Sequence, residues 1–381
     1  MIYMSRLNFQ LPVIVNAMLD KLPKWVWSSK ETTFLDPSMG GGQFVSEIER
    51  RLREAGWSDE NIHTRVFGFE NDEMVINFAI NINNLVGTYR VLDFFSWSPD
   101  MKFDVIIGNP PYQGGLSMHQ QFFNKAIHLT KDGGAVCFIQ PATPYFNKKK
   151  NKRSHEIDMI ENLKKYETSV RFYPSTAFGN VLIGTGLSAT FLTKTVSSIK
   201  TVSTVEYENG SVYKNLNIED INFLSIEPII YNSIKAKYMQ FIDKNGSLHD
   251  ITDYSGKKQG AYIQGIRGHI GTDDFFTIIS DNEAQHVNSD TKTKGMSVEI
   301  EEDRMKYFFS YAKTFIARYG LAMTKFNQHN DTGELKTVPL VSFNRYWTDE
   351  DLAKLIGLTD DEVSLIRSVL PDFHGLLKNV G

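Results

Sequence analysis

The chain has one cysteine, Cys137, among its 381 residues, so it cannot form an internal disulfide. It also has no cysteine and histidine cluster with the spacing of zinc ligands. No run reaches the roughly 18 apolar residues of a membrane-spanning helix. The residues up to Trp27 lack the basic start, apolar run and small-residue cleavage site of a secretory signal. We therefore expect a cytoplasmic protein, mature from Met1, that involves neither a membrane nor a metal.

An excess of basic residues is also missing. Lysine and arginine number 41 against 45 aspartates and glutamates, which gives a net charge of −4. Any nucleic-acid partner would therefore have to be held by local basic patches. No repeat of 20 to 50 residues occurs, which excludes solenoids and propellers. With 41% hydrophobic and 23% charged residues, the composition is that of a folded protein, and its length suggests two to three domains.

The first half alternates short apolar segments with segments of helical period, which predicts an α/β fold with crossover helices. The predicted strands are residues 33–35, 65–69, 89–92, 103–108 and 134–139, and one of the predicted helices spans residues 118–129. Residues 169–173 and 185–193 would add an antiparallel hairpin. We expect the first domain to end at residue 195.

The periodicity weakens after residue 195, and a glycine-rich stretch covers residues 255–269. We interpret residues 196–340 as a second, less regular domain. Residues 341–381 contain two candidate capping boxes, Thr348 with Asp351 and Thr359 with Glu362. They predict a short C-terminal helical segment.

Three successive predicted strands end in residues that suit a nucleoside ligand. A glycine-rich loop, Asp36 to Gly42, follows the first strand, and its glycines allow close backbone approach. Glu70 follows the second strand, and its carboxylate could accept hydrogen bonds from both hydroxyl groups of a ribose. Asp93 follows the third and could bind an adenine amine, with Phe94 or Phe95 against the ring. Each feature alone has a purely structural alternative, but their order describes one nucleoside across the sheet edge.

The fourth strand leads into Asn109-Pro110-Pro111-Tyr112. Two prolines fix this backbone, so the Asn109 side chain and the Pro110 carbonyl are presented as two acceptors beside an aromatic ring. Two acceptors could bind both protons of an adenine amine and favour a more tetrahedral nitrogen. Tyr112 could stack on a base extruded from a duplex.

These motifs resemble those of S-adenosylmethionine-dependent amino-methyltransferases, specifically DNA adenine-N6 methyltransferases. The loop Asp36 to Gly42 is similar to their Asp-Pro-x-x-Gly-x-Gly cofactor loop, with Ser38-Met39 in place of the commoner Ala-Cys. Asn109 to Tyr112 is similar to their catalytic motif. Phe9 to Pro12 and the following helix resemble the N-terminal cofactor-capping motif of the gamma arrangement. The resemblance covers residues 9–195.

The resemblance implies a Rossmann-like class I methyltransferase fold with a mostly parallel sheet, plus a C-terminal mixed α+β target-recognition domain. It implies in-line methyl transfer from S-adenosyl-L-methionine to the N6 amine of a flipped adenine in duplex DNA, without a metal or a cysteine intermediate. It also suggests a prokaryotic or phage-encoded context and a cognate restriction endonuclease acting separately. The catalytic residues would be Asn109, Pro110, Pro111 and Tyr112. The cofactor residues would be Phe9, Pro12, Asp36, Pro37, Ser38, Met39, Gly40, Gly42, Phe44, Glu70, Asn71, Asp93, Phe94 and Asn109.

Several basic and polar clusters could contact DNA, although each could equally be an ordinary solvated surface. The candidates are Lys148, Lys149, Lys150, Lys152 and Arg153 after the fifth strand, and Lys257, Lys258, Gln264 and Arg267 in the glycine-rich stretch. A further cluster is Arg318, Tyr319, Lys325, Asn327, Gln328 and His329. Cys137 lies on a predicted buried strand and should be an inert thiol.

Three other interpretations share parts of this pattern. An RNA adenine methyltransferase would carry the same catalytic motif. Release-factor glutamine methyltransferases place their additional domain before the core, whereas here about 185 residues follow it. A non-catalytic nucleic-acid-binding subunit would not need to keep both motifs intact.

Overall fold

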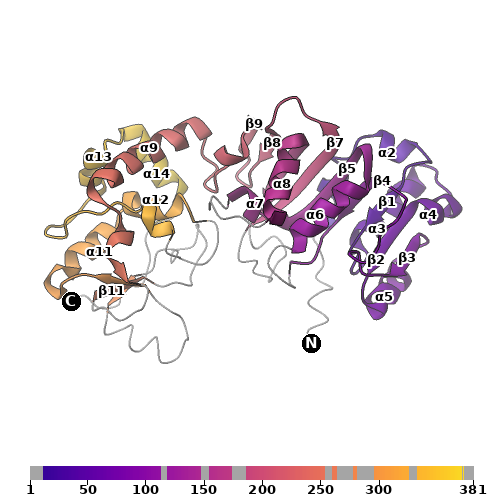
Figure 1. Cartoon of the computed structure of the whole chain (residues 1–381), viewed down its shortest axis with the longest axis horizontal. Helices are drawn as coiled ribbons and strands as arrows, with labels where there is room; N and C mark the ends of the chain where they lie inside the picture. Colours follow the sequence, from indigo (N-terminus) through magenta and orange to yellow (C-terminus); the bar gives the residue numbers. More distant parts are fainter. Residues whose placement is uncertain are drawn as a thin grey trace. The chain divides into compact units, whose positions relative to one another are not determined.

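The structure is a computed structural model that describes residues 12–112, 118–146, 154–173, 186–253, 260–263, 278–280, 296–325, 333–370 and 372. The chain divides into two compact units (Figure 1). One consists of Met1–Tyr145 with Lys149–Ile218, and the other of Phe146–Lys148 with Glu219–Gly381. In the described residues no helix is long and apolar enough to span a bilayer.

The first unit is built on a sheet that has nine strands in the described residues, in the order β3-β2-β1-β4-β5-β7-β6-β8-β9. The strands are β1 (Phe34–Asp36), β2 (Val66–Glu70), β3 (Thr88–Val91), β4 (Phe103–Gly108), β5 (Thr130–Pro141), β6 (Tyr166–Tyr173), β7 (Leu187–Val196), β8 (Val202–Glu206) and β9 (Val212–Leu216). Neighbours from β3 to β5 are parallel, whereas β7 is antiparallel to β5 and β6. The expected mostly parallel α/β fold with a closing hairpin is confirmed.

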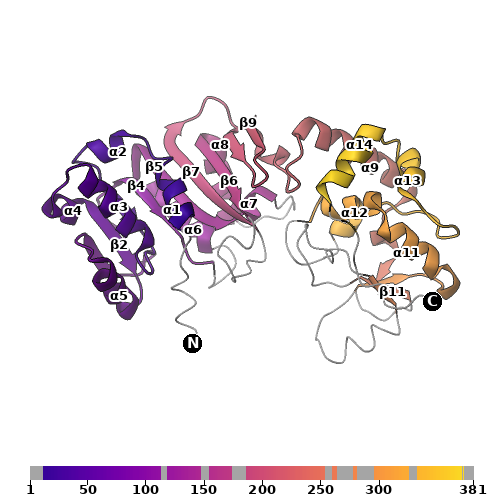
Figure 2. The same ribbon diagram turned by 180° about the vertical axis from the view of Figure 1, so that it is seen from behind.

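Helices cover both faces of this sheet (Figures 1 and 2). They are α1 (Pro12–Leu19), α2 (Trp25–Ser28), α3 (Gln43–Glu54), α4 (Asp59–Arg65), α5 (Glu73–Asn83), α6 (Met118–Leu129), α7 (Thr143–Phe146) and α8 (Ser154–Lys165). Along β5, Cys137 and Ile139 pack with the buried side chains of α1 and α3, whereas the Phe138 ring lies against Phe123 of α6. This alternation is what a strand buried on both faces requires.

The strand order reverses between β1 and β4, which pair in parallel as direct neighbours. In open α/β sheets, ligands bind outside the carboxyl ends of the strands at such a reversal. β1 ends at Asp36 and β4 at Gly108. The fold therefore brings the glycine-rich loop and the Asn-Pro-Pro-Tyr segment to the same edge.

The sequence periodicity located most elements but not all. The helix at residues 118–129 and the strand at 103–108 have the predicted bounds, whereas β5 begins at Thr130, four residues before the predicted start. We did not predict α4 or α8, nor the extension of the sheet by β8 and β9. Because β8 pairs with β6, the first compact unit continues to Ile218, and a domain boundary at residue 195 stays a prediction.

The second unit combines helices with a small antiparallel sheet of order β10-β13-β11-β12. Its strands are β10 (Thr252–Asp253), β11 (Gly260–Ile263), β12 (Ile278–Ser280) and β13 (Met296–Glu299). Its α-helices are α9 (Pro228–Asn245), α11 (Met305–Lys313), α12 (Phe315–Ala322), α13 (Asp349–Ile356) and α14 (Asp360–Val369), and short 3₁₀ helices are η2 (Ile218–Asp220), η3 (Leu248–Ile251), η4 (Glu302–Arg304) and η5 (Glu334–Thr337). Both predicted capping boxes are present, at the starts of α13 and α14. The expected mixed α+β character is confirmed.

Candidate active site at the carboxyl edge of the sheet

The loop between β1 and α3 is shaped by its glycines and by a buried carboxyl. Gly40 and Gly42 have φ of 49° and 81°, the left-handed region in which a side chain is strained. Asp36 is 1% exposed, and its Oδ1 accepts the Ser38 N–H at 3.0 Å. Burial raises the pKa of Asp36 to about 8; the Ser38 bond opposes this rise and the charge of Glu70 adds to it. The Asp36 carboxyl is therefore mostly protonated at neutral pH.

Glu70, at the end of β2, braces this loop. Its Oε2 accepts the Gly40 N–H at 3.1 Å, and its Oε1 accepts the Asn71 N–H at 2.9 Å. A carboxylate oxygen can accept more than one hydrogen bond, so the side chain can hold the loop and still accept from a ligand. The ribose role of Glu70 stays a prediction.

The loop after β3 is organised by a lysine that the sequence did not single out. Lys125 of α6 donates to the carbonyls of Phe94 at 2.7 Å and Phe95 at 3.1 Å, and also to that of Trp97. Its ammonium lies 5.1 Å from the centre of the Phe94 ring. Burial lowers the pKa of Lys125, and the charge of Asp93 opposes that change. A lone lysine on an amphipathic helix carries no sequence signal for this role, because most such lysines face solvent.

The two aromatic residues of this loop lie differently. Phe94 is 2% exposed and stacks on Phe122 with ring centres 5.0 Å apart, whereas Phe95 is 38% exposed. Asp93 is exposed, and its Oδ1 accepts the Phe95 N–H at 3.0 Å. An adenine contact by Phe94 or Phe95 stays a prediction, and exposure favours Phe95.

The Asn-Pro-Pro-Tyr segment begins where β4 passes Asp36. A Cβ at Gly108 would lie 2.5 Å from Asp36 Oδ1, so only glycine allows this approach. The Tyr112 hydroxyl donates to Asn109 Oδ1 at 2.5 Å, with the Ile139 carbonyl at 3.3 Å as a second acceptor. Burial raises the pKa of Tyr112, which keeps the hydroxyl protonated as a donor. Tyr112 thereby orients the amide of Asn109.

A direct hydrogen bond joins the two motifs. The Ser38 hydroxyl, in the glycine-rich loop, donates to the main-chain carbonyl of Asn109 at 3.1 Å. These residues are 71 positions apart in the chain, and the pairing of β1 with β4 brings them together. The only sequence signal for this contact was the departure of Ser38 from the commoner alanine.

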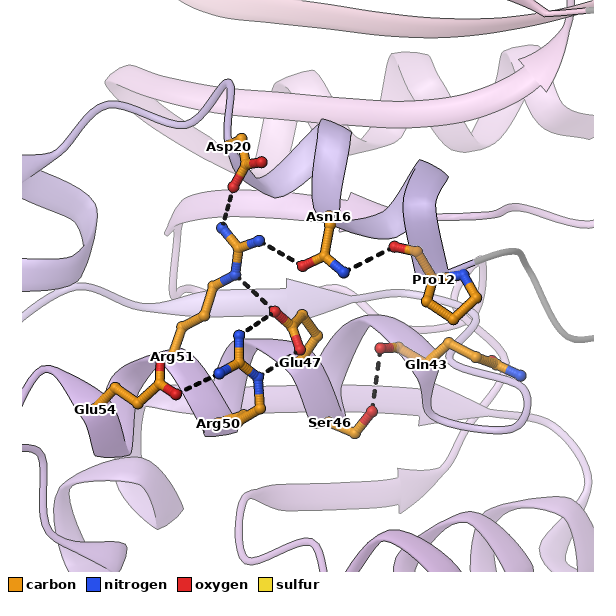
Figure 3. A network of polar contacts seen from close by, with 9 residues as sticks. All are labelled: Pro12, Asn16, Asp20, Gln43, Ser46, Glu47, Arg50, Arg51 and Glu54. Atoms are coloured by element: carbon orange, nitrogen blue, oxygen red, sulfur yellow. Dashed lines mark hydrogen bonds and ion pairs between the residues drawn. The ribbon is translucent and has the colours of Figure 1, made fainter.

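The N-terminal helix is fixed to the helix that follows the glycine-rich loop (Figure 3). Arg51 of α3 binds Asp20 at 2.7 Å, Asn16 at 2.6 Å and Glu47 at 2.8 Å. Asn16 in turn donates to the Pro12 carbonyl at 2.8 Å. Arg51 thus holds the start of α1, where the predicted cofactor residue Pro12 is exposed. Phe9 lies outside the described residues.

The predicted DNA contacts divide into two groups. Outside the described residues lie Lys148, Lys149, Lys150, Lys152, Arg153, Lys257, Lys258, Gln264, Arg267, Asn327, Gln328 and His329. The prediction that Arg318, Tyr319 and Lys325 form a polar surface cluster is wrong, because all three are at most 1% exposed. Tyr319 packs in the core of the second unit, and an amphipathic side chain can be buried where periodicity suggests a surface.

Cys137 is buried on β5, as predicted, and burial raises the pKa of its thiol to about 12. Within the ranges that the structure describes, no three histidine, cysteine or acidic side chains are placed to hold a metal.

Residues 47–178 match the model of a family described as Eco57I restriction-modification methylase. The Type II methyltransferase M.CvrRI of Paramecium bursaria Chlorella virus XZ-6E is 34% identical over 83 residues, which cover 21% of this chain and 18% of that protein. The Type II methyltransferase M.TthHB8I of Thermus thermophilus is 26% identical over a stretch covering 29% of each chain. This chain therefore spans less than a third of the length of these curated relatives.

Among solved structures, the EcoKI M protein of a Type I restriction enzyme has 16% identity and a TM-score of 0.41, covering 51% of this chain and 47% of that one. A class I S-adenosylmethionine-dependent methyltransferase from Listeria monocytogenes has 17% identity and a TM-score of 0.40, covering 52% and 64%. The family match includes the Asn-Pro-Pro-Tyr segment. It confirms the expected resemblance to restriction-modification methyltransferases for that part of the chain.

Proposed function

We propose that this chain transfers a methyl group from S-adenosyl-L-methionine to the N6 amine of an adenine in duplex DNA, with the base rotated out of the helix. The observation that carries the proposal is the hydrogen bond of 3.1 Å between Ser38 of the glycine-rich loop and Asn109 of the Asn-Pro-Pro-Tyr segment. It supports a site in which a loop suited to a nucleoside cofactor and a pair of amine acceptors face the same space.

The residues at the loop fit a cationic nucleoside. Among the residues that the structure describes, none lies within 4 Å of a Cβ built at Gly40, so they leave the loop open on that side. Glu70 supplies a carboxylate at the end of β2, and Asp36, which is mostly protonated at pH 7, would supply a second one at the end of β1 after losing its proton. When bound there, S-adenosylmethionine supplies an electrophilic methyl group on a sulfonium. Asp36 and the loop backbone would hold its methionine part, Glu70 the ribose, and Asp93 with its neighbouring aromatic ring the adenine.

The target amine would be held by Asn109 Oδ1 and the Pro110 carbonyl. Oδ1 already accepts from Tyr112, but an amide oxygen has two lone pairs and can accept from the amine as well. Two acceptors would draw on both N–H bonds and turn the nitrogen lone pair toward the methyl donor. Positioning and desolvation, rather than a strong base, would supply most of the acceleration.

We also propose duplex DNA as the partner, read by the second unit, and a cognate restriction endonuclease as a separate protein. The family match supports a restriction-modification context. The mixed α+β unit that follows the core supports a target-recognition role. Methyl transfer to a base inside a duplex requires the base to leave the stack, which is the role proposed for the space beside Tyr112.

The test is incubation with tritiated S-adenosylmethionine and, in parallel, unmethylated duplex DNA, single-stranded DNA, RNA and release-factor protein. Nucleoside mass spectrometry then identifies the product. We expect N6-methyladenine in duplex DNA. Label in RNA or protein would overturn the substrate, and label in none would overturn the proposed activity.

Asn109→Ala is the matched variant in this assay. It removes one acceptor of the amine and leaves the glycine-rich loop in place. We expect it to lose most of the methyl transfer and to keep its affinity for the cofactor nearly unchanged. Loss of cofactor affinity with normal transfer at saturation would contradict the assigned role.

A further inference from the structure

The peptide group between Asn109 and Pro110 has only one site for a conventional hydrogen bond, its carbonyl oxygen. Proline has no N–H, so the carbonyl of Asn109 is the group through which a hydrogen bond can fix this peptide plane. The Ser38 hydroxyl donates to that carbonyl at 3.1 Å. The next carbonyl along the chain is that of Pro110, one of the two acceptors assigned to the target amine. A rotation of the Asn109 peptide would therefore move that acceptor.

The position of Ser38 is itself fixed by contacts at the ends of β1 and β4. Its N–H donates to Asp36 Oδ1 at 3.0 Å, and Asp36 is 1% exposed. The absence of a side chain at Gly108 lets β4 pass close to the same carboxyl. The pairing of β1 with β4 fixes the two strand ends relative to each other. The Ser38 hydroxyl thus extends from a half-buried residue, whose N–H is bound to the buried Asp36, to the first residue of the Asn-Pro-Pro-Tyr segment.

The side chain of Asn109 is held separately. Its Oδ1 accepts from Tyr112 at 2.5 Å, while its main-chain carbonyl accepts from Ser38. Tyr112 therefore orients one acceptor of the amine, and Ser38 orients the backbone that carries the other. Because Ser38 belongs to the glycine-rich loop, it also sets this backbone relative to the loop that would hold the methyl donor.

We propose that Ser38 is a positioning residue for methyl transfer, which aligns the Asn109 and Pro110 backbone with the cofactor loop. This inference rests on the proposed function. A residue without a hydroxyl at this position could not donate the bond to the Asn109 carbonyl. The effect of losing this bond should fall on the transfer step, because small displacements of reacting groups lower the rate more than they lower binding.

The chain offers a closely matched control. Ser46 lies on α3, the helix that follows the same loop, and donates its hydroxyl to the Gln43 carbonyl, also at 3.1 Å (Figure 3). Ser38→Ala and Ser46→Ala thus remove bonds of the same kind and length. Ser38→Thr keeps the hydroxyl and serves as the rescue variant.

The first measurement is the single-turnover rate of methyl transfer by the full chain at saturating cofactor and duplex DNA. We expect Ser38→Ala to be about tenfold slower, the effect of one hydrogen bond, with the Kd for cofactor and DNA within about twofold of the unchanged protein. Ser46→Ala should keep the full rate, and Ser38→Thr should recover most of it. A Ser38→Ala rate equal to that of Ser46→Ala would refute the inference, as would a loss confined to cofactor affinity.

A second measurement reads the same bond without activity. Asn109-Pro110 is the one Asn-Pro pair in the sequence, so labelling asparagine with ¹³C at the carbonyl and proline with ¹⁵N gives a single carbonyl–nitrogen NMR signal. Ser38→Ala should shift this carbonyl signal, and Ser46→Ala should leave it in place. An unshifted signal would refute the contact. A shifted signal in a chain that methylates no acceptor would retain the alignment and overturn the proposed function.

Discussion

Lys125→Met removes the group that organises the loop after β3. Methionine keeps most of the length and apolar volume of the lysine stem but has no N–H donors. The substitution leaves the carbonyls of Phe94, Phe95 and Trp97 without the ammonium that now binds all three. It also removes the cation that lies 5.1 Å from the Phe94 ring centre. The loop should then sample other conformations, and a ligand must pay the cost of ordering it.

The magnitude follows from these bonds. A hydrogen bond from a charged donor contributes roughly 1.5–3 kcal/mol. Lys125 is only half-buried, so water can replace part of the three bonds in the variant. We therefore expect a net loss equivalent to about one such bond, which weakens cofactor binding by about tenfold to a hundredfold. The transfer rate at saturating cofactor should be nearly unchanged, because Asn109 and Pro110 keep their contacts.

Isothermal titration of the variant with S-adenosylmethionine or its demethylated product measures this effect. Lys131→Met is the control: its ammonium binds Asp104 at 2.7 Å at the start of β5, the end of the strand remote from the site. Lys131→Met should bind cofactor like the unchanged protein, and melting curves should show both variants folded. Equal affinities for the two variants, or a fall in rate with unchanged affinity, would refute the reasoning.

The remaining predictions concern two buried carboxyl groups. Burial raises the pKa of Asp36 from 3.8 to about 8, so this carboxyl is mostly protonated at pH 7. If a cationic ligand needs the carboxylate form, Asp36 must release its proton when the ligand binds. Cofactor affinity should rise with pH up to about 8 and then level off, whereas the unfolding free energy of the cofactor-free protein should fall over pH 4 to 8. Calorimetry of cofactor binding in buffers of different ionisation heat measures the proton release, which Asp36→Asn should abolish. A cofactor affinity that does not change with pH would contradict the prediction. Glu49 is fully buried and accepts the N–H groups of Val86 at 2.9 Å and Gly87 at 2.8 Å. Glu49→Ala should lower the unfolding free energy in urea by about 2–5 kcal/mol, and a loss below about 1 kcal/mol would show that the contact is not needed.

Local patterns in the sequence were enough to predict most elements of the first unit. Strands such as Phe103–Gly108 are short apolar runs, and helices such as Met118–Leu129 repeat apolar residues at a period near 3.6. Capping residues such as Thr348 act on the N–H groups of their own first turn. Signals of this kind depend on neighbours within a few residues, so they can be read without knowing the fold.

The elements that were missed have a different origin. β8 and β9 are short strands with half-exposed residues, and they join the sheet because β6 offers a free edge for pairing. A strand that is stabilised chiefly by its partner has a weak pattern of its own. Arg318 and Lys325 read as surface residues by type, but tertiary packing buries them in the second unit.

The sequence by itself determined the two motifs and the end of the strand on which each lies, and it predicted the type of ligand that each suits. Those properties follow from residue type and from strand-loop-helix order. Only the tertiary structure decided that Ser38 donates a hydrogen bond to the carbonyl of Asn109 and that Lys125 donates hydrogen bonds to the carbonyls of the loop after β3. Such contacts join residues 28 to 71 positions apart, and they depend on which strands become neighbours and in what register. A pattern of local periodicity specifies which face of a strand is buried, but not which distant side chain will meet it.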